Sequence, residues 1–164
     1  ASGVSSVLFL AMFAVSISLA GVDWFMALEP MWFSTVWGAY HFAGLAASTL
    51  AVVVLAVVQL RRSGSCHGAF TDDHLHDLGK LLLGFSCFWM YLWFCQYMLI
   101  WYSNIPEGTG YFVRRSQGAW GPLMLANVAL NWVVPFFVLL PRPAKRNGTI
   151  MARVAAIVNA GCMP

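Results

Sequence analysis

Apolar residues occur in long blocks along this chain, and short polar or charged connections separate the blocks. The blocks extend roughly over residues 4–21, 34–60, 78–103 and 119–140, and a fifth begins near Ile150. The first four are each long enough to cross about 30 Å of hydrocarbon as a helix. Helices are required because lipid leaves no partner for free backbone groups, and the blocks are too long and too uniformly apolar for barrel strands. The pattern therefore predicts an all-α fold, a polytopic transmembrane bundle of about five helices across residues 1–164.

Composition points the same way. Hydrophobic residues make up 60% of the chain and charged residues 9%, which argues against a soluble globular domain. The chain opens at Ala1 without a basic leader, and its last apolar block stops at Pro164 after about fifteen residues, short of a full span. We therefore expect the chain to be an internal piece of a larger subunit.

The charged residues predict how the bundle is oriented. Two connections hold most of the basic residues, which are Arg61, Arg62, Arg142, Lys145 and Arg146. The other connections hold Arg114 and Arg115 beside Asp23, Glu29 and Glu107. Because short cytoplasmic loops carry the excess of Lys and Arg, residues 61–77 and 141–149 are predicted to be cytoplasmic loops and residues 104–118 a periplasmic loop.

Residues 22–33 mix apolar and acidic side chains and contain Pro30, so this segment is too short and too broken to span a bilayer. We expect it to lie along the outer interface. Tryptophans gather near the same predicted face, as in an aromatic belt, and they are Trp24, Trp32, Trp37, Trp101 and Trp120.

The second block carries small residues at four-residue spacing. They are Ala43, Ala47 and Ala51 on one line and Gly44 and Ser48 on another. Small side chains at this spacing let a neighbouring helix approach closely.

The cysteines and histidines do not form a metal or haem motif. The four cysteines, Cys66, Cys87, Cys95 and Cys162, include no C-x-x-C pair. Free thiols that pack as small hydrophobic side chains are the better interpretation. His41 is the only histidine well inside a block, so the chain cannot supply the paired imidazoles of a membrane haem. We predict no metal site and no covalently bound cofactor.

Three polar side chains inside the apolar blocks are candidates for chemistry, because such groups are costly in lipid. His41, Gln96 and Asn127 each lie about 10 Å inside the outer end of their blocks, at about 1.5 Å per helical residue. Such a layer would suit a small quinone-like ligand, whose oxygens need a few placed partners in an apolar pocket. His41 could accept a proton from a quinol. The alternative is structural, with interhelical hydrogen bonds from His41, from Gln96 and from Asn127 with Asn131.

A second polar group lies where the third block begins. His76 and Lys80 are four residues apart and Asp77 and Lys80 three apart, so on a helix they form a local charge cluster. Such a cluster could pass protons toward polar groups deeper in the bundle. Two alternatives stay open: a solvated helix start capped by one of residues 71–73, and a metal site that uses His74.

Several stretches resemble one family of membrane subunits. They are residues 23–35 (DWFMALEPMWFST), 74–80 (HLHDLGK), 88–107 (FWMYLWFCQYMLIWYSNIPE) and 141–147 (PRPAKRN). They look like the ActF family, integral membrane subunits of bacterial alternative complex III that belong with the NrfD or polysulfide-reductase membrane anchors. The likeness covers nearly the whole chain, and the motif in the third block is the specific part.

The resemblance implies a subunit of about ten helices in two bundles, of which this chain is part of the later half. It implies a bacterial inner-membrane location, a sister NrfD-like subunit, and iron–sulfur and multihaem cytochrome c subunits that carry the redox cofactors. It implies quinol oxidation coupled to an electron acceptor such as cytochrome c, with proton conduction as this subunit's contribution. The resemblance therefore favours proton conduction over direct contact with quinol as the role of His41, Asp77 and Lys80. No nucleic-acid partner is expected.

Two other functions stay open from the sequence. The chain could belong to a transporter or channel unrelated to redox chemistry, or to a structural membrane anchor for peripheral redox subunits. Quinol-dependent reduction of an acceptor separates the redox subunit from the transporter. Substitution of His41 or Asp77 separates it from the anchor, which should turn over normally without them.

Overall fold

The chain is helical throughout most of its computed structural model, which describes residues 2–28, 32–64 and 71–162. The long helices are α1 (Ser2–Ala20), α2 (Trp37–Arg62) and α3 (Asp72–Ser103). The shorter helices are α4 (Pro106–Ser116), α5 (Trp120–Val128), α6 (Val134–Leu139), α7 (Arg142–Arg146) and α8 (Gly148–Cys162). Two π-helical segments, η1 (Gly21–Phe25) and η3 (Ala129–Val133), and one 3-10 turn, η2 (Met26–Leu28), complete the helical structure. The described ranges contain no strand.

Four helical stretches are long and apolar enough to cross a membrane. They are Gly3–Leu28, Trp37–Arg62, Asp72–Ser103 and Trp120–Leu139. The predicted fifth helix is α8, which is apolar but shorter. The predicted all-α class is therefore confirmed, with four helices of spanning length.

Two boundaries differ from the prediction because of local capping. α3 begins at Asp72 rather than at residue 78, since Thr71 and His74 form a reciprocal capping box in which the Thr71 N–H donates to His74 Nδ1 at 3.1 Å. The segment 104–118, predicted as a loop, is mostly α4. Its Pro106 occupies the first turn, where a fixed φ and a missing N–H cost nothing.

The predicted interfacial segment is partly helical. Helical geometry continues beyond α1 through η1 and η2 to Leu28. Residues 29–31 of this segment, with Glu29 and Pro30, lie outside the described residues, as do residues 65–70 of the predicted cytoplasmic loop, with Cys66.

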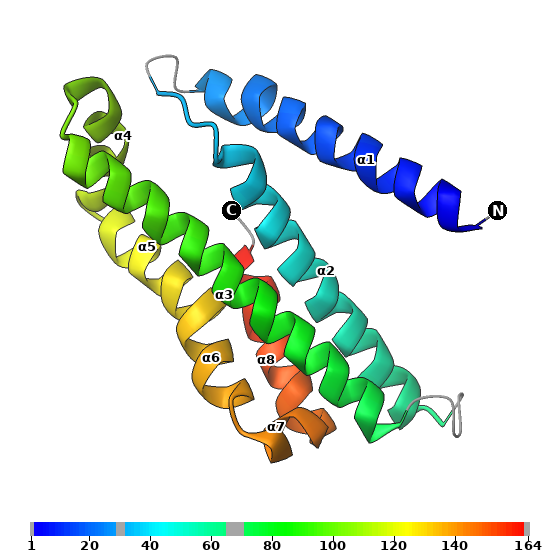
Figure 1. Cartoon of the computed structure of the whole chain (residues 1–164). Coiled ribbons are helices and arrows are strands. Elements are labelled where there is room, and N and C mark those ends of the chain that lie inside the picture. The colour runs from blue at the N-terminus through cyan, green and yellow to red at the C-terminus, as the bar shows by residue number, and fades with distance from the viewer. Residues whose placement is uncertain (1, 29–31, 65–70, 163–164) are drawn as a thin grey trace.

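The core lies where α2, α3 and α8 meet, with α8 behind the two long helices in Figure 1. The small residues predicted to permit close approach are buried on α2 and are Ala43, Ala47 and Ala51. On the second line of small residues, the Ser48 hydroxyl donates to Asn159 Oδ1 of α8 at 2.8 Å, and Gly44 lies against the indole of Trp89 in α3. The predicted close packing of this helix is confirmed.

The fourth of these long apolar stretches, Trp120–Leu139, which we call the fourth span, runs through α5, η3 and α6 as one continuous helical path. Pro135 has no N–H to donate along the helix, and the π-helical turn η3 directly precedes it. Asn131 in this turn is 4% exposed and faces α8. A Cβ on Gly161 would lie 2.7 Å from Asn131 Nδ2, so only glycine permits this approach of α8.

α1 packs on the first turns of α2 and then diverges from it toward the N-terminus (Figure 1). Ser18 lies against Gly38, and the rings of Phe13 and Phe42 are 6.2 Å apart. Most other side chains of α1 are exposed. The apolar surface of this helix is therefore not covered by the other described helices.

Candidate functional site

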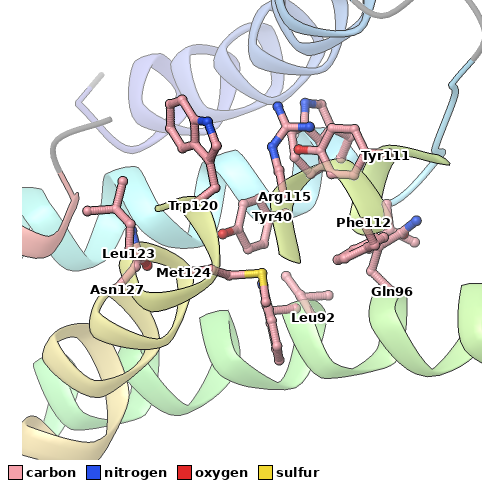
Figure 2. Close-up of a pocket in the computed structure, with 13 residues that line it drawn as sticks. Tyr40, Leu92, Gln96, Tyr111, Phe112, Arg115, Trp120, Leu123, Met124 and Asn127 are labelled. Carbon is pink, nitrogen blue, oxygen red and sulfur yellow. The ribbon is translucent and has the colours of Figure 1, made fainter. Parts of the chain in front are cut away.

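A cavity of about 270 Å³ opens at the end of the bundle where α2 begins and α3 ends, which we call the outer end (Figure 2). It is lined by Val36, Trp37, Tyr40, Leu92, Trp93, Gln96, Tyr111, Phe112, Arg115, Trp120, Leu123, Met124 and Asn127. The walls are mainly aromatic and aliphatic, with a few polar groups among them. This is the composition of a small-molecule site, and the volume lies just below the usual range of about 300–1,000 Å³.

α4 covers one side of this cavity through an aromatic cluster. The Tyr111 ring stacks on Trp32 with centroids 4.1 Å apart and meets Trp37 edge-on at 5.9 Å. One turn later, the guanidinium carbon of Arg115 lies 3.6 Å from the centre of the Tyr111 ring, a cation–π contact. α4 is thus fixed to the start of α2, and it brings a positive charge to the cavity wall.

Gln96 reaches the cavity from α3. The Ser34 hydroxyl donates to Gln96 Oε1 at 2.7 Å, which fixes the orientation of the amide. The amide nitrogen then carries the two N–H donors, and no described residue accepts from it. Gln96 therefore has donors for a ligand oxygen.

Asn127 reaches the same cavity from α5, but its amide is already engaged. Its Nδ2 donates to the Gly161 carbonyl at 3.0 Å, and Asn131 Nδ2 donates to Asn127 Oδ1 at 3.2 Å. The two asparagines share a helix face, and Asn127 links α5 to α8 while Asn131 donates back to Asn127. The predicted interhelical hydrogen bond is confirmed for Asn127.

His41 does not line the cavity but lies behind its wall. Its Nδ1 is 2.9 Å from the Trp37 carbonyl, and since a carbonyl only accepts, Nδ1 carries the hydrogen. The imidazole meets the rings of Trp37 and Tyr40 edge-on, at 4.8 and 5.7 Å, and both of those rings line the cavity. The structure therefore brings Gln96 and Asn127 together and places His41 one layer away.

Several donors around the cavity lack acceptors. The indole N–H groups of Trp32 and Trp37 are buried and have no acceptor among the described residues, which is costly in a folded protein. Arg115 pairs with no carboxylate among the residues that the structure describes. Because the two indole nitrogens are not accessible, Arg115 is the charged group of the cavity wall that an oxygen-bearing ligand could meet.

The predicted cluster at the start of α3 is present at the opposite end, which we call the inner end. Lys80 Nζ lies 2.7 Å and His76 Nδ1 3.7 Å from Asp77 Oδ1. Asp77 precedes the apolar part of α3. The hydrogen bond and the charge of Lys80 hold the pKa of the Asp77 carboxyl below its usual range. His74 serves in the capping box. The contact is confirmed, but the Asp77 carboxylate is exposed and paired with Lys80, so the geometry adds no support to the expected role in proton traffic.

Metal binding by these groups finds no geometric support. Among the described residues, no three His, Cys, Asp or Glu side chains gather in a way that could hold a metal ion. Of the cysteines, Cys87 and Cys95 are free thiols within α3.

Sequence reasoning missed the contribution of α4. Tyr111 and Arg115 are four residues apart, and Pro106 precedes them, so the sequence did carry a signal for a short helix with one aromatic and basic face. It also missed Arg153, an exposed arginine on the otherwise apolar α8.

No protein-family model matches this chain, and no curated protein is significantly similar to it.

Proposed function

We propose that this chain is part of a membrane subunit of a bacterial quinol:electron-acceptor oxidoreductase, and that its outer cavity holds the quinone head group. The observation that supports this most is one cavity, among helices long enough to cross a membrane, that combines aromatic walls with the amide of Gln96 and the guanidinium of Arg115. A quinone ring is flat and apolar on its faces and carries two oxygens that accept hydrogen bonds. Those properties complement this cavity.

Two donors suit the two oxygens of such a ring. Gln96 reaches the cavity from α3 and Arg115 from α4, and both residues line it (Figure 2). Arg115 also favours negative charge on an adjacent oxygen, which develops when a quinol loses a proton. The aromatic rings of the cavity offer stacking surface to the ligand.

Quinol oxidation breaks two O–H bonds and releases two protons and two electrons. In this proposal the electrons pass to iron–sulfur and haem c groups in partner subunits, as the sequence resemblance implies. His41, which lies behind the Trp37–Tyr40 wall, stays a candidate to accept a proton. The inner cluster is a separate matter, since Asp77 and Gln96 lie about 28 Å apart along α3 at about 1.5 Å per residue. A proton path between them would need further groups.

Quenching of tryptophan fluorescence tests the proposal directly, because Trp37, Trp93 and Trp120 line the cavity. Purified protein in detergent is titrated with a short-chain quinone. We expect saturable quenching that Gln96→Leu weakens by about tenfold in apparent Kd, since a lost hydrogen bond to a buried oxygen costs about 1–3 kcal/mol.

Gln117→Leu is the matched control. Gln117 ends α4 at the same end of the bundle, but it is exposed and does not line the cavity. Its variant should bind the quinone like the unmodified protein. Linear, unsaturable quenching that is equal in all three proteins would show that the quinone only partitions into the micelle, and the proposal would fail.

A further inference from the structure

A basic hollow of about 230 Å³ lies at the inner end, where α2 ends and α8 begins. Its lining residues are Val58, Arg61, Arg62, Arg146, Gly148 and Thr149. Three guanidinium groups from two separate parts of the chain thus surround one small space with a valine on its wall. The hollow is independent of the outer cavity and has no part in the function proposed above.

Two of the three arginines are held in place by ion pairs with the first turn of α3. Arg61 lies 2.7 Å from Asp72 Oδ1, and Arg146 lies 2.8 Å from Asp73 Oδ1. Each pair uses one nitrogen of a guanidinium that has five N–H donors. The pairs therefore fix the positions of Arg61 and Arg146 and leave both with donors to spare.

Arg62 supplies the charge that these pairs do not balance. No carboxylate in the described part of the chain pairs with it, so the hollow keeps a net positive charge. An anion of one negative charge would balance it, and planar guanidinium groups are well suited to the oxygens of a phosphate.

Backbone N–H groups in the first turn of α8 are already engaged by a side chain. Asn147 Oδ1 already accepts from the backbone N–H groups of Thr149 and Ile150, at 3.0 and 3.4 Å. A second observation comes from Arg153, which is exposed one turn after Thr149 on the same face of α8. A cation on an apolar helix is expensive in hydrocarbon and calls for an anionic partner near the membrane surface.

The position of the hollow selects the kind of anion. The hollow lies at the end of α2, a helix long enough to span a membrane. Val58 therefore adjoins the apolar part of that helix, and the arginines adjoin its end, where the chain would meet water. Phospholipid phosphates occupy that level of a bilayer, and basic pockets between spanning helices recognise anionic head groups. We propose that the hollow binds the phosphodiester of an anionic phospholipid.

Native mass spectrometry of the whole protein in detergent tests this, with phosphatidylglycerol, phosphatidylcholine and inorganic phosphate as probes. We expect retention of phosphatidylglycerol over phosphatidylcholine by about tenfold, and loss of that preference in Arg62→Gln. Arg62→Gln leaves both ion pairs intact. Arg62→Lys, which keeps the charge, should keep most of the preference and covers the case in which the glutamine variant fails to fold.

Arg142→Gln is the matched control, because Arg142 is an exposed arginine of the same end that does not line the hollow. It should retain the preference for phosphatidylglycerol. Equal losses in Arg142→Gln and Arg62→Gln would show a diffuse charge effect and overturn the proposal. Equal retention of both lipids, or inorganic phosphate that binds as tightly as the lipid, would overturn it as well.

Discussion

Gly161 is the residue on which the contact between α8 and the fourth span depends. The Asn131 amide and the Leu130 Cβ lie 2.7 and 3.0 Å from where a Cβ on Gly161 would sit. The same Gly161 carbonyl accepts from Asn127 at 3.0 Å. A single missing methyl group therefore allows a short amide network to join three helical segments next to the outer cavity.

Gly161→Ala should destabilise the protein by about 1–3 kcal/mol, because the added methyl group forces these neighbours apart. Unfolding in mixed micelles measures the change. Gly84→Ala is the control, since nothing lies within 4 Å of a Cβ there, and it should leave stability unchanged or raise it by up to about 1 kcal/mol. Equal effects of the two variants would contradict the close contact at Gly161.

Asp77 illustrates how exposure limits the role of a residue. Its side chain is 65% exposed, and Lys80 lowers its pKa. A lowered pKa keeps the carboxylate ionised at neutral pH. Its ion pair therefore contributes to stability above the ordinary pKa of an aspartate, and the contribution is lost as the pH falls through the lowered value.

Asp77→Asn in the assembled complex should leave quinol:acceptor turnover within about twofold of the unmodified complex, because the carboxylate is exposed, paired and remote from the outer cavity. Haem content checks assembly. A large loss of turnover in a fully assembled complex would instead establish the inner cluster as a proton entry.

At the scale of helices, the seam between α2 and α8 combines small residues with one polar link. The Ser48 hydroxyl donates to Asn159 Oδ1 at 2.8 Å across this seam, and neighbouring buried residues are Ala47, Ala51, Val154 and Ala155. Small side chains let the two backbones approach, and the hydrogen bond fixes how far α8 slides along α2.

A double-mutant cycle with Ser48→Ala and Asn159→Ala measures that link. We expect a coupling energy of about 0.5–1.5 kcal/mol, the usual size for hydrogen bonds between spanning helices. Additive effects of the two substitutions would mean that Ser48 and Asn159 do not interact in the membrane.

The sequence predicted the long helices well, because an apolar block of spanning length leaves the backbone no alternative to a helix. It was less informative where local chemistry decides. The capping box of Thr71 and His74 extends α3 beyond the apolar block, and Pro106 converts a predicted loop into α4. The pattern of apolar and polar residues does not predict the π-helical turn η3 before Pro135.

At the scale of the whole molecule, the two ends differ in chemistry. The outer end holds an aromatic cavity and the inner end a group of arginines, at opposite ends of α2. Depth along a helix could be predicted by counting residues, and Gln96 and Asn127 do share a cavity. The rotation of each helix about its axis could not be predicted, because packing against neighbouring helices sets it. For that reason His41 lies behind the cavity wall, and Arg115 of α4 lines the cavity instead.

Photolabelling with an azidoquinone tests whether the outer cavity binds a quinone. The intact protein is illuminated with the probe in the membrane, digested, and its labelled peptides are identified by mass spectrometry. We expect labels on α4 and α5, within residues 106–127, that excess unlabelled quinone suppresses and that Gln96→Leu reduces. Labels confined to other helices, or labels on α4 and α5 that excess quinone does not suppress, would contradict a quinone site in the outer cavity.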